Sequence, residues 1–330
     1  MRIKLVLILL LGCLCILSTP AMAAVMTADD TNAANTSFNS DAESHWSPAG
    51  APSAGNTYSN GGWLLRTPTT AGNYTFAGDS LTIGGPSPHY PFLTDGTTNN
   101  NCLINKTPTS PTITVGNLIL DAGTVRDGMG SGDTWTLAGN IFVTSNGGGL
   151  ICQSHFNVDS KISGSGNLYI GANGSGEAAR TVYIDSGLNT YNGSIKLLGA
   201  DAAHSRLTFA ANSLMNFTIG ASGVNNSISG TGTAEFDGIF NFDLTGASTN
   251  FGDSWTIANA TVDTFVDATF SVNGFTSMGG GVWTKAIDDA KWYQFSESAT
   301  SATLTVVPEP ATCILLILGA MGIAFYSRKK

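Results

Sequence analysis

The chain has 330 residues and a formal net charge of −9. Five of its 14 Lys and Arg residues lie at positions 2, 4 and 328–330, so nine accompany the 23 Asp and Glu of residues 29–309, a net charge of −14. Such an acidic surface repels phosphate backbones and anionic lipid, and we expect no nucleic-acid partner. The length is sufficient to bury a substantial hydrophobic core.

The N-terminal segment has the pattern of a secretory signal peptide. Arg2 and Lys4 form a basic start, residues 5–17 are apolar, and Ala21-Met22-Ala23 fits an A-x-A cleavage site. We predict a signal helix over this segment, its removal by signal peptidase before Ala24, and export of the rest of the chain.

Lipoprotein processing is the alternative for the same segment, because Leu10-Leu11-Gly12-Cys13 approximates a lipobox. A mature lipoprotein turns polar after its cysteine, whereas this chain stays apolar as far as Leu17. The sequence therefore favours ordinary signal peptidase.

Residues 24–110 are rich in Asn, Thr, Ser, Pro and Gly. Aromatic side chains recur through this region, at Trp46, Tyr58, Trp63, Tyr74 and Phe76. A stack of β-coils needs a cover over its first open rung. We predict that the region is a β-rich cap, disordered over residues 24–40.

Two of the five cysteines, Cys102 and Cys152, lie outside the terminal segments and are 50 residues apart. Exported proteins reach an oxidising compartment, so we expect a disulfide between them. A loop of that length predicts a stabilisation of about 4 kcal/mol. Two separate buried thiols are the alternative.

Residues 111–250 consist of short apolar or alternating segments separated by Gly, Asn, Ser and Asp, which is typical of many β-strands. Three strands begin with the same pair, at Gly116-Asn117, Gly139-Asn140 and Gly166-Asn167, with spacings of 23 and 27 residues. Coils of ~20–30 residues stack as a β-solenoid. The sequence therefore predicts an all-β chain with a parallel β-helix body.

One segment carries a family resemblance. Residues 162–170 contain Gly164-Ser165-Gly166-Asn167-Leu168, and residues 188–195 contain Asn189-Thr190-Tyr191-Asn192-Gly193-Ser194. This resembles the autotransporter-associated β-strand repeat, which runs G-x-G-x-L and then N-T-Y-x-G-x-T. Ser194 replaces the usual Thr, and the intervening insertion is longer than the repeat normally allows. The resemblance implies a passenger-like, right-handed parallel β-helix without catalytic residues.

Residues 251–307 have a dense aromatic content, and we expect closing rungs or a small β-sandwich there. Exposed aromatic rings stack on the apolar faces of sugars. Trp63, Trp283 and Trp292 are the candidates for glycan stacking, with packing in the core or cap as the alternative.

Chemistry-bearing motifs are missing from the sequence. The four histidines stand outside metal-ligand spacing, and there is no H-E-x-x-H, G-x-S-x-G, phosphate-loop or EF-hand pattern. We therefore expect no catalytic residues, no metal and no cofactor.

The C-terminal segment has three parts. Pro308-Glu309-Pro310 follows Val307, the stretch Ala311–Tyr326 is apolar and uncharged, and Arg328, Lys329 and Lys330 are basic. As a helix, the 16 apolar residues would reach ~24 Å, a little short of the ~30 Å hydrocarbon core. The positive-inside rule places the basic end in the cytoplasm. We predict a transmembrane helix within residues 308–330.

These three parts resemble the PEP-CTERM sorting signal of Gram-negative, biofilm-forming bacteria, whose cognate membrane protease is an exosortase. The resemblance covers about a tenth of the chain. It implies an intermediate anchored in the inner membrane, cleavage by the exosortase, and delivery to the cell surface or the extracellular space. Exopolysaccharide is a further expected partner. An ordinary anchor that no protease cuts is the alternative.

The sequence as a whole predicts an exported surface or extracellular-matrix protein with a structural or adhesive role and no catalysis. A carbohydrate-binding surface protein is the first alternative, and a β-helix polysaccharide-degrading enzyme is the second. Such an enzyme needs basic and acidic groups that converge in a groove, and nine scattered cations do not indicate one.

Overall fold

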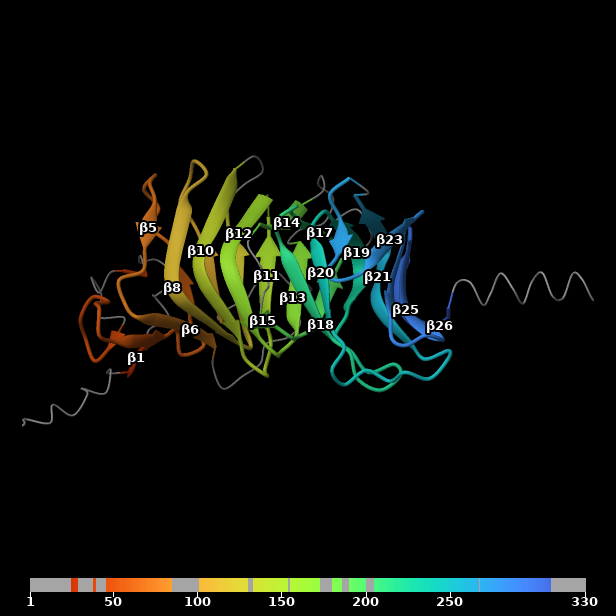
Figure 1. The fold of residues 1–330 in the computed structure, drawn as a ribbon. Helices are drawn as coiled ribbons and strands as arrows, with labels where there is room; N and C mark the ends of the chain where they lie inside the picture. The colour runs from red at the N-terminus through yellow and green to blue at the C-terminus, as the bar shows by residue number, and fades with distance from the viewer. Residues whose placement is uncertain are drawn as a thin grey trace, which may run out of the picture.

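A computed structural model describes residues 25–28, 38–39, 46–84, 101–129, 133–153, 155–172, 180–185, 190–199, 205–266 and 268–309. Within these ranges the chain is all-β, with 26 strands and no helix. The strands follow one another along an elongated body (Figure 1). The predicted signal helix and transmembrane helix lie outside the described residues.

The body is a parallel β-solenoid of about seven turns, which confirms the predicted fold class. Its turns contribute strands to three parallel ladders. The first ladder contains β5 (Tyr74–Thr75), β8 (Thr112–Asp121), β10 (Thr134–Val143), β12 (His155–Gly164), β14 (Arg180–Ile184), β17 (Ser205–Phe209), β19 (Ile228–Phe236) and β21 (Ser254–Phe265). The second contains β1 (Val25–Ala28), β3 (Thr57–Ser59), β6 (Ser80–Gly84), the C-terminal parts of β8, β10 and β12, and β15 (Thr190–Tyr191).

The third ladder contains β4 (Leu64–Arg66), β7 (Cys102–Asn105), β9 (Gly123–Asp127), β11 (Gly148–Cys152), β13 (Leu168–Ala172), β16 (Ile195–Leu198) and the N-terminal parts of β19 and β21. Long strands such as β8 and β19 therefore serve two ladders, one with each half. A separate parallel sheet holds β18 (Leu214–Thr218), β20 (Ile239–Asp243) and β22 (Ser271–Val272).

The register places residues of the same kind above one another. One inward column of the first ladder is apolar in six successive coils, and these six residues are at most 1% exposed: Ile113, Leu137, Val158, Ile184, Phe209 and Phe236. Each of these side chains is buried by the coils on either side of it. The stack of coils is therefore the unit that makes the core, as in other repeat architectures.

Two of the three Gly-Asn pairs stack on each other in adjacent coils, as the repeated pattern predicts. Asn140 pairs with Asn117 one coil below, and its side-chain amide donates to the Gly116 carbonyl at 2.9 Å. Gly139 has φ 113, and a Cβ there would lie 1.9 Å from the Val115 oxygen, so only glycine fits this bend. The third pair is not in this column, because Leu168 pairs with Gly148 in the third ladder.

The two halves of the autotransporter-like segment lie on adjacent coils. Gly164 pairs with Tyr191, and Leu168 pairs with Ile195. The buried Tyr191 hydroxyl is 2.8 Å from the Gly166 carbonyl oxygen. A Cβ at Gly193 would lie 2.0 Å from the same oxygen, so the glycines and the tyrosine of this segment form one close-packed corner.

The solenoid begins earlier than the predicted boundary at residue 111. β1 pairs parallel with β3, and β3 with β6, so much of the region expected to be a cap already forms coils. β1 also lies within the stretch that was expected to be disordered. β2 (Trp46–Ser47) pairs antiparallel with β1 and departs from the parallel pattern.

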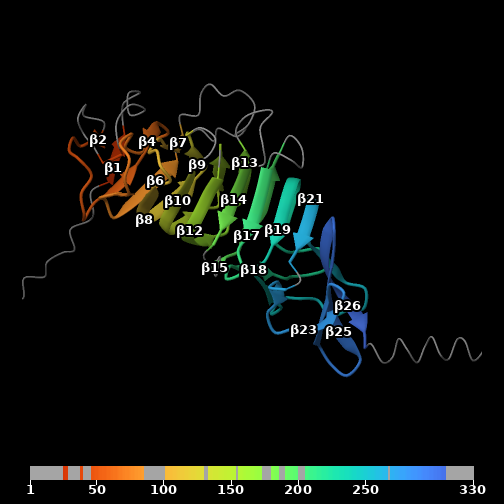
Figure 2. The same cartoon turned by 90° about the horizontal axis from the view of Figure 1, so that it is seen from above.

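At the other end, residues 251–307 form a closing rung, as one of the two expected arrangements has it, followed by an antiparallel sheet. β21 is a parallel closing rung on β19, and four antiparallel strands continue from it. These are β23 (Thr276–Gly279), β24 (Val282–Ala286), β25 (Lys291–Ser298) and β26 (Ser301–Pro308). We call these four strands the C-terminal cap, and Figure 2 shows β23, β25 and β26 gathered at that end of the stack. The aromatic rings of the C-terminal cap extend the hydrophobic core, and the Phe295 ring centre lies 6.0 Å from the Phe240 ring centre.

Candidate functional site

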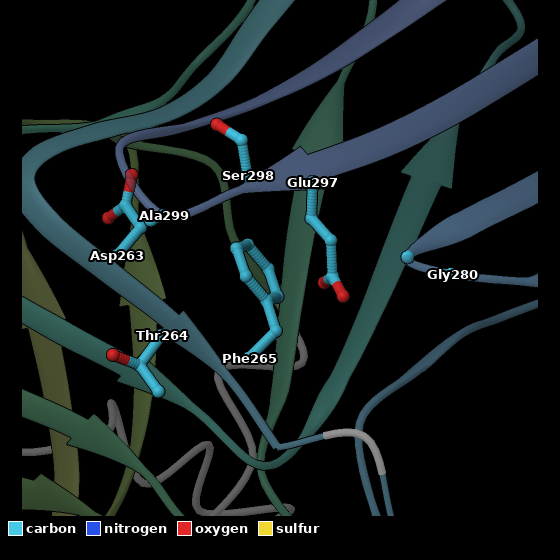
Figure 3. A pocket seen from close by; sticks show the side chains of 8 residues that line it. Asp263, Thr264, Phe265, Gly280, Glu297, Ser298 and Ala299 are labelled. Carbon is cyan, nitrogen blue, oxygen red and sulfur yellow. The ribbon is translucent and has the colours of Figure 1, made fainter.

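A pocket of about 400 Å³ lies where the last coil meets the C-terminal cap (Figure 3). It is lined by Asp263, Thr264 and Phe265 of β21, Gly280 and Gly281 of the turn before β24, and Glu297, Ser298 and Ala299 at the end of β25. The lining thus contains two carboxylates and no Lys, Arg or His. We call it the acidic pocket.

Asp263 occupies a position that belongs to the hydrophobic core in the preceding coils. The register stacks it on an inward column of the first ladder that contains Trp135, Phe156, Val182, Leu207 and Ala234. Each of those residues is at most 1% exposed. The last coil therefore places a carboxylate where five earlier coils place an apolar side chain.

The Asp263 side chain is only 3% exposed, and among the described residues neither carboxylate oxygen has a hydrogen-bond partner. Its backbone is held, because Asp263 N donates to the Ala299 oxygen at 2.9 Å. Burial raises the pKa of Asp263 to about 7. The backbone N–H of Ala260 acts in the opposite direction without reaching hydrogen-bonding geometry.

Glu297 enters the pocket from the opposite strand. It is half-buried, and its backbone N donates to the Gly281 oxygen at 3.0 Å. Gly281 has φ 74, and a Cβ there would lie 2.6 Å from Glu297 Cγ. Glycine at this position therefore gives the Glu297 side chain its room.

Phe265 separates the two acids. Figure 3 shows its ring between Asp263 and Glu297, while Thr264 points to the other side of the strand. The ring packs on Phe236 at 4.8 Å and on Phe270 at 4.9 Å, which fixes its place. An acid–base pair has to act on the same reacting atoms. The two acids lie on different sides of the ring, where each can contact a different part of one bound ligand.

The predicted disulfide is wrong, because Cys102 and Cys152 are both free and buried. Cys102 pairs with Thr124, and Thr124 pairs with Gly149, three residues before Cys152. The cysteines therefore lie two coils apart and, since side chains alternate along a strand, on opposite faces of the ladder. Their Cα atoms are roughly 14 Å apart by rung and strand spacing, beyond the ~7 Å reach of a disulfide.

The three tryptophans proposed for glycan stacking do not share a surface. Trp283 is 8% exposed and packs on Phe270 at 5.1 Å, so it is a core residue of the cap, and the expectation is wrong for it. Trp63 is partly buried against the core beside β4, at the N-terminal end. Trp292 is partly buried on β25, in the cap. For these two, stacking stays a prediction.

The residues of the expected sorting signal are described only in part. Val307 and Pro308 end β26, where they pair with Trp292 and Lys291, and Glu309 N donates to the Ala290 oxygen at 2.9 Å. Pro310 and the basic end (Arg328, Lys329, Lys330) lie outside the described residues, as do Ala21, Ala23 and Ala24 of the cleavage site. No described residue belongs to a helix with the length and hydropathy needed to cross a bilayer.

Among the described residues, no three His, Cys, Asp or Glu side chains are grouped as metal ligands. Sequence reasoning did not single out Asp263 or Glu297. The available signal was the alternation of Asp263 with Phe265, which puts both on the same face of a strand.

Comparison of the chain with protein-family models, with curated proteins and with solved structures gave no match.

Proposed function

We propose that this chain is an exported surface or extracellular-matrix protein with a structural or adhesive role. The observation that carries the proposal is the continuous inward column of apolar residues, which fills the interior of successive coils. A solid stack of this kind makes a stiff body that offers long side faces for contact. The proposal includes no catalysis, and the acids of the acidic pocket serve binding in it.

The proposed route is export by the N-terminal signal, followed by processing at the C-terminal segment. It rests on the basic, apolar and Pro-Glu-Pro patterns of the sequence. The fold is compatible with this route, because β26 leads into Pro308 with no linker between the body and the tail. Signal peptidase and an exosortase-type protease would be the processing partners.

Carbohydrate binding is the second candidate function. The acidic pocket favours it, because a ring flanked by hydrogen-bonding carboxylates can hold a sugar by stacking and by polar contacts. A neutral or cationic sugar fits this pocket better than an acidic one.

Replacement of Pro308, Glu309 and Pro310 by alanine tests the route. In a host with an exosortase, we expect the wild type in the surface or medium fraction and the triple variant uncut in the membrane fraction. The variant leaves the apolar segment and the basic end of the sequence unchanged, so we expect it still to insert. Equal release of both proteins, measured by fractionation and immunoblotting, would contradict the proposed processing.

A further inference from the structure

No Lys, Arg or His is among the described residues that line the acidic pocket. The described part of residues 251–309 contains two cations, and both are occupied elsewhere. Lys291 Nζ lies 3.3 Å from Asp288 Oδ2, and Lys285 Nζ lies 5.8 Å from the centre of the Phe275 ring. A pocket lined by acids attracts positively charged ligands, all the more because the Asp263 carboxylate is buried and has no hydrogen-bond partner among the described residues.

The size of the pocket favours an organic ligand over a bare metal ion. Its volume of about 400 Å³ falls within the usual range of ~300–1,000 Å³ for small-molecule sites. Calcium takes about six to eight oxygen ligands. The side chains that line the pocket offer the oxygen atoms of Asp263, Glu297 and Ser298. These oxygen atoms lie on two sides of the Phe265 ring.

The Phe265 ring adds an aromatic contact to the charge and the size of the pocket. A cation within ~6 Å of an aromatic ring is attracted to its face, and an apolar ring face also suits the C–H face of a sugar. We propose that the acidic pocket binds an amino sugar, with its ammonium group beside Asp263 and its ring against Phe265. Glu297 and Ser298 then lie where sugar hydroxyls need partners.

This assignment explains why the core column ends in an acid. A buried carboxylate without a partner opposes folding, and an apolar residue such as those below it would stabilise the coil. A cation bound beside Asp263 offsets that penalty. The inference deepens the second candidate function and does not depend on export or processing.

Thermal unfolding of the full-length chain in detergent, with D-glucosamine added, tests the proposal. We expect a saturable rise in melting temperature with a Kd on the order of 1 mM, because a ligand that binds only the folded state stabilises it. N-acetylglucosamine has the same ring without the charge, and we expect it to bind at least about tenfold more weakly.

Variants locate the site. Asp263→Asn removes the charge at nearly constant volume, and we expect about a tenfold loss of glucosamine affinity or more. Phe265→Leu keeps the pocket apolar but removes the ring, and it should also weaken binding. Glu235→Gln is the matched control, because Glu235 pairs with Thr264 and lies on the outward face of the neighbouring strand. Its affinity should equal that of the wild type.

Four results would overturn the proposal. The first is no saturable effect of glucosamine on the wild type. The second is equal binding by the wild type and Asp263→Asn. The third is equal binding of Nα-acetyl-lysine methylamide, which would make the pocket a site for protein lysines. The fourth is stabilisation by CaCl₂ alone, which would make it a metal site. None of these results bears on whether the protein is exported and processed.

Discussion

At the scale of single residues, Asp263 makes the folding stability of the protein depend on pH in the direction opposite to that of a salt-bridged acid. An aspartate in an unfolded chain has a pKa of ~3.9, and burial raises the folded value to about 7. Between these values the native state keeps a proton that the unfolded state has released. Stability therefore falls as the pH rises through this window, by at most about 1.4 kcal/mol per pH unit, and levels off above it.

We predict that Asp263→Asn removes this decline and makes the protein at least as stable as the wild type at neutral pH. Asparagine has nearly the same shape but cannot ionise. The measurement is the free energy of unfolding by urea at several values between about pH 5 and pH 7. Glu297→Gln is measured alongside, because Glu297 is the other ionisable side chain that lines the pocket.

Asp243→Asn serves as the control. Asp243 is exposed, and hydrogen bonds from Thr245 lower its pKa. A lowered pKa favours the folded state at higher pH, so this variant should keep the decline seen in the wild type. An unchanged decline in Asp263→Asn would show that Asp263 does not titrate as described.

The residue scale also shows a limit of sequence reasoning. The two cysteines satisfied every compositional argument for a disulfide, but spacing along the chain does not reveal which face of a strand each side chain takes. That depends on the register of two coils. The same register decides that Asp263 points inward, and the sequence alone does not contain it.

At the scale of elements, the corner around Tyr191 shows how one side chain joins two coils. The Tyr191 hydroxyl lies 2.8 Å from the Gly166 oxygen and 3.0 Å from the Ser194 oxygen, so it joins two coils at a bend. The hydroxyl is buried with these carbonyl groups. A phenylalanine would fill the same space and leave the carbonyl oxygens without this donor.

We predict that Tyr191→Phe destabilises the protein by about 1–2 kcal/mol, because it removes a buried hydrogen bond to the Gly166 oxygen, while the Ser194 oxygen keeps the bond from Leu168 N. Tyr183→Phe is the matched control, because Tyr183 alternates with the buried Val182 and Ile184 and is partly exposed. Urea unfolding followed by circular dichroism measures both. Equal stability of Tyr191→Phe and wild type would show that the corner does not depend on the hydroxyl.

Elements were predicted with uneven success for a physical reason. Of the three Gly-Asn glycines, Gly139 is the one with a left-handed φ, and the three pairs precede strand segments of different ladders. The pattern therefore shows where coils occur in the sequence, but it does not show which ladder the strand after each Gly-Asn pair joins. The N-terminal coils were missed because their strands are short, β3 having three residues and β5 having two. Strands of that length are stable only when stacked and leave little periodicity in the sequence.

At the scale of the whole molecule, the C-terminal cap closes an open end of the stack. The rings of Phe265 and Phe270 lie 6.2 Å and 6.1 Å from Phe295 of the cap, and β26 covers the N-terminal part of β21. Without the cap, these apolar side chains and the hydrogen-bonding groups of the β21 edge would meet water. Exposed edges of this kind promote association between chains.

We predict that a chain ending at residue 273, which lacks all four cap strands, forms aggregates. A chain ending at residue 309 keeps the cap and should stay monomeric in the same buffer. Size-exclusion chromatography with light scattering distinguishes the two. A monodisperse, folded product from the shorter chain would show that the closing coil is stable by itself.

The stacked architecture does not fix the number of coils, and therefore does not fix the length of the solenoid. Each coil in the middle of the stack rests on one neighbour and supports another, and the apolar column repeats at every level. Duplicating or deleting a whole coil would therefore change the height of the body by about 4.8 Å without altering either end. The acidic pocket and the strand that leads into the C-terminal segment would remain unchanged at the end of a longer or shorter solenoid.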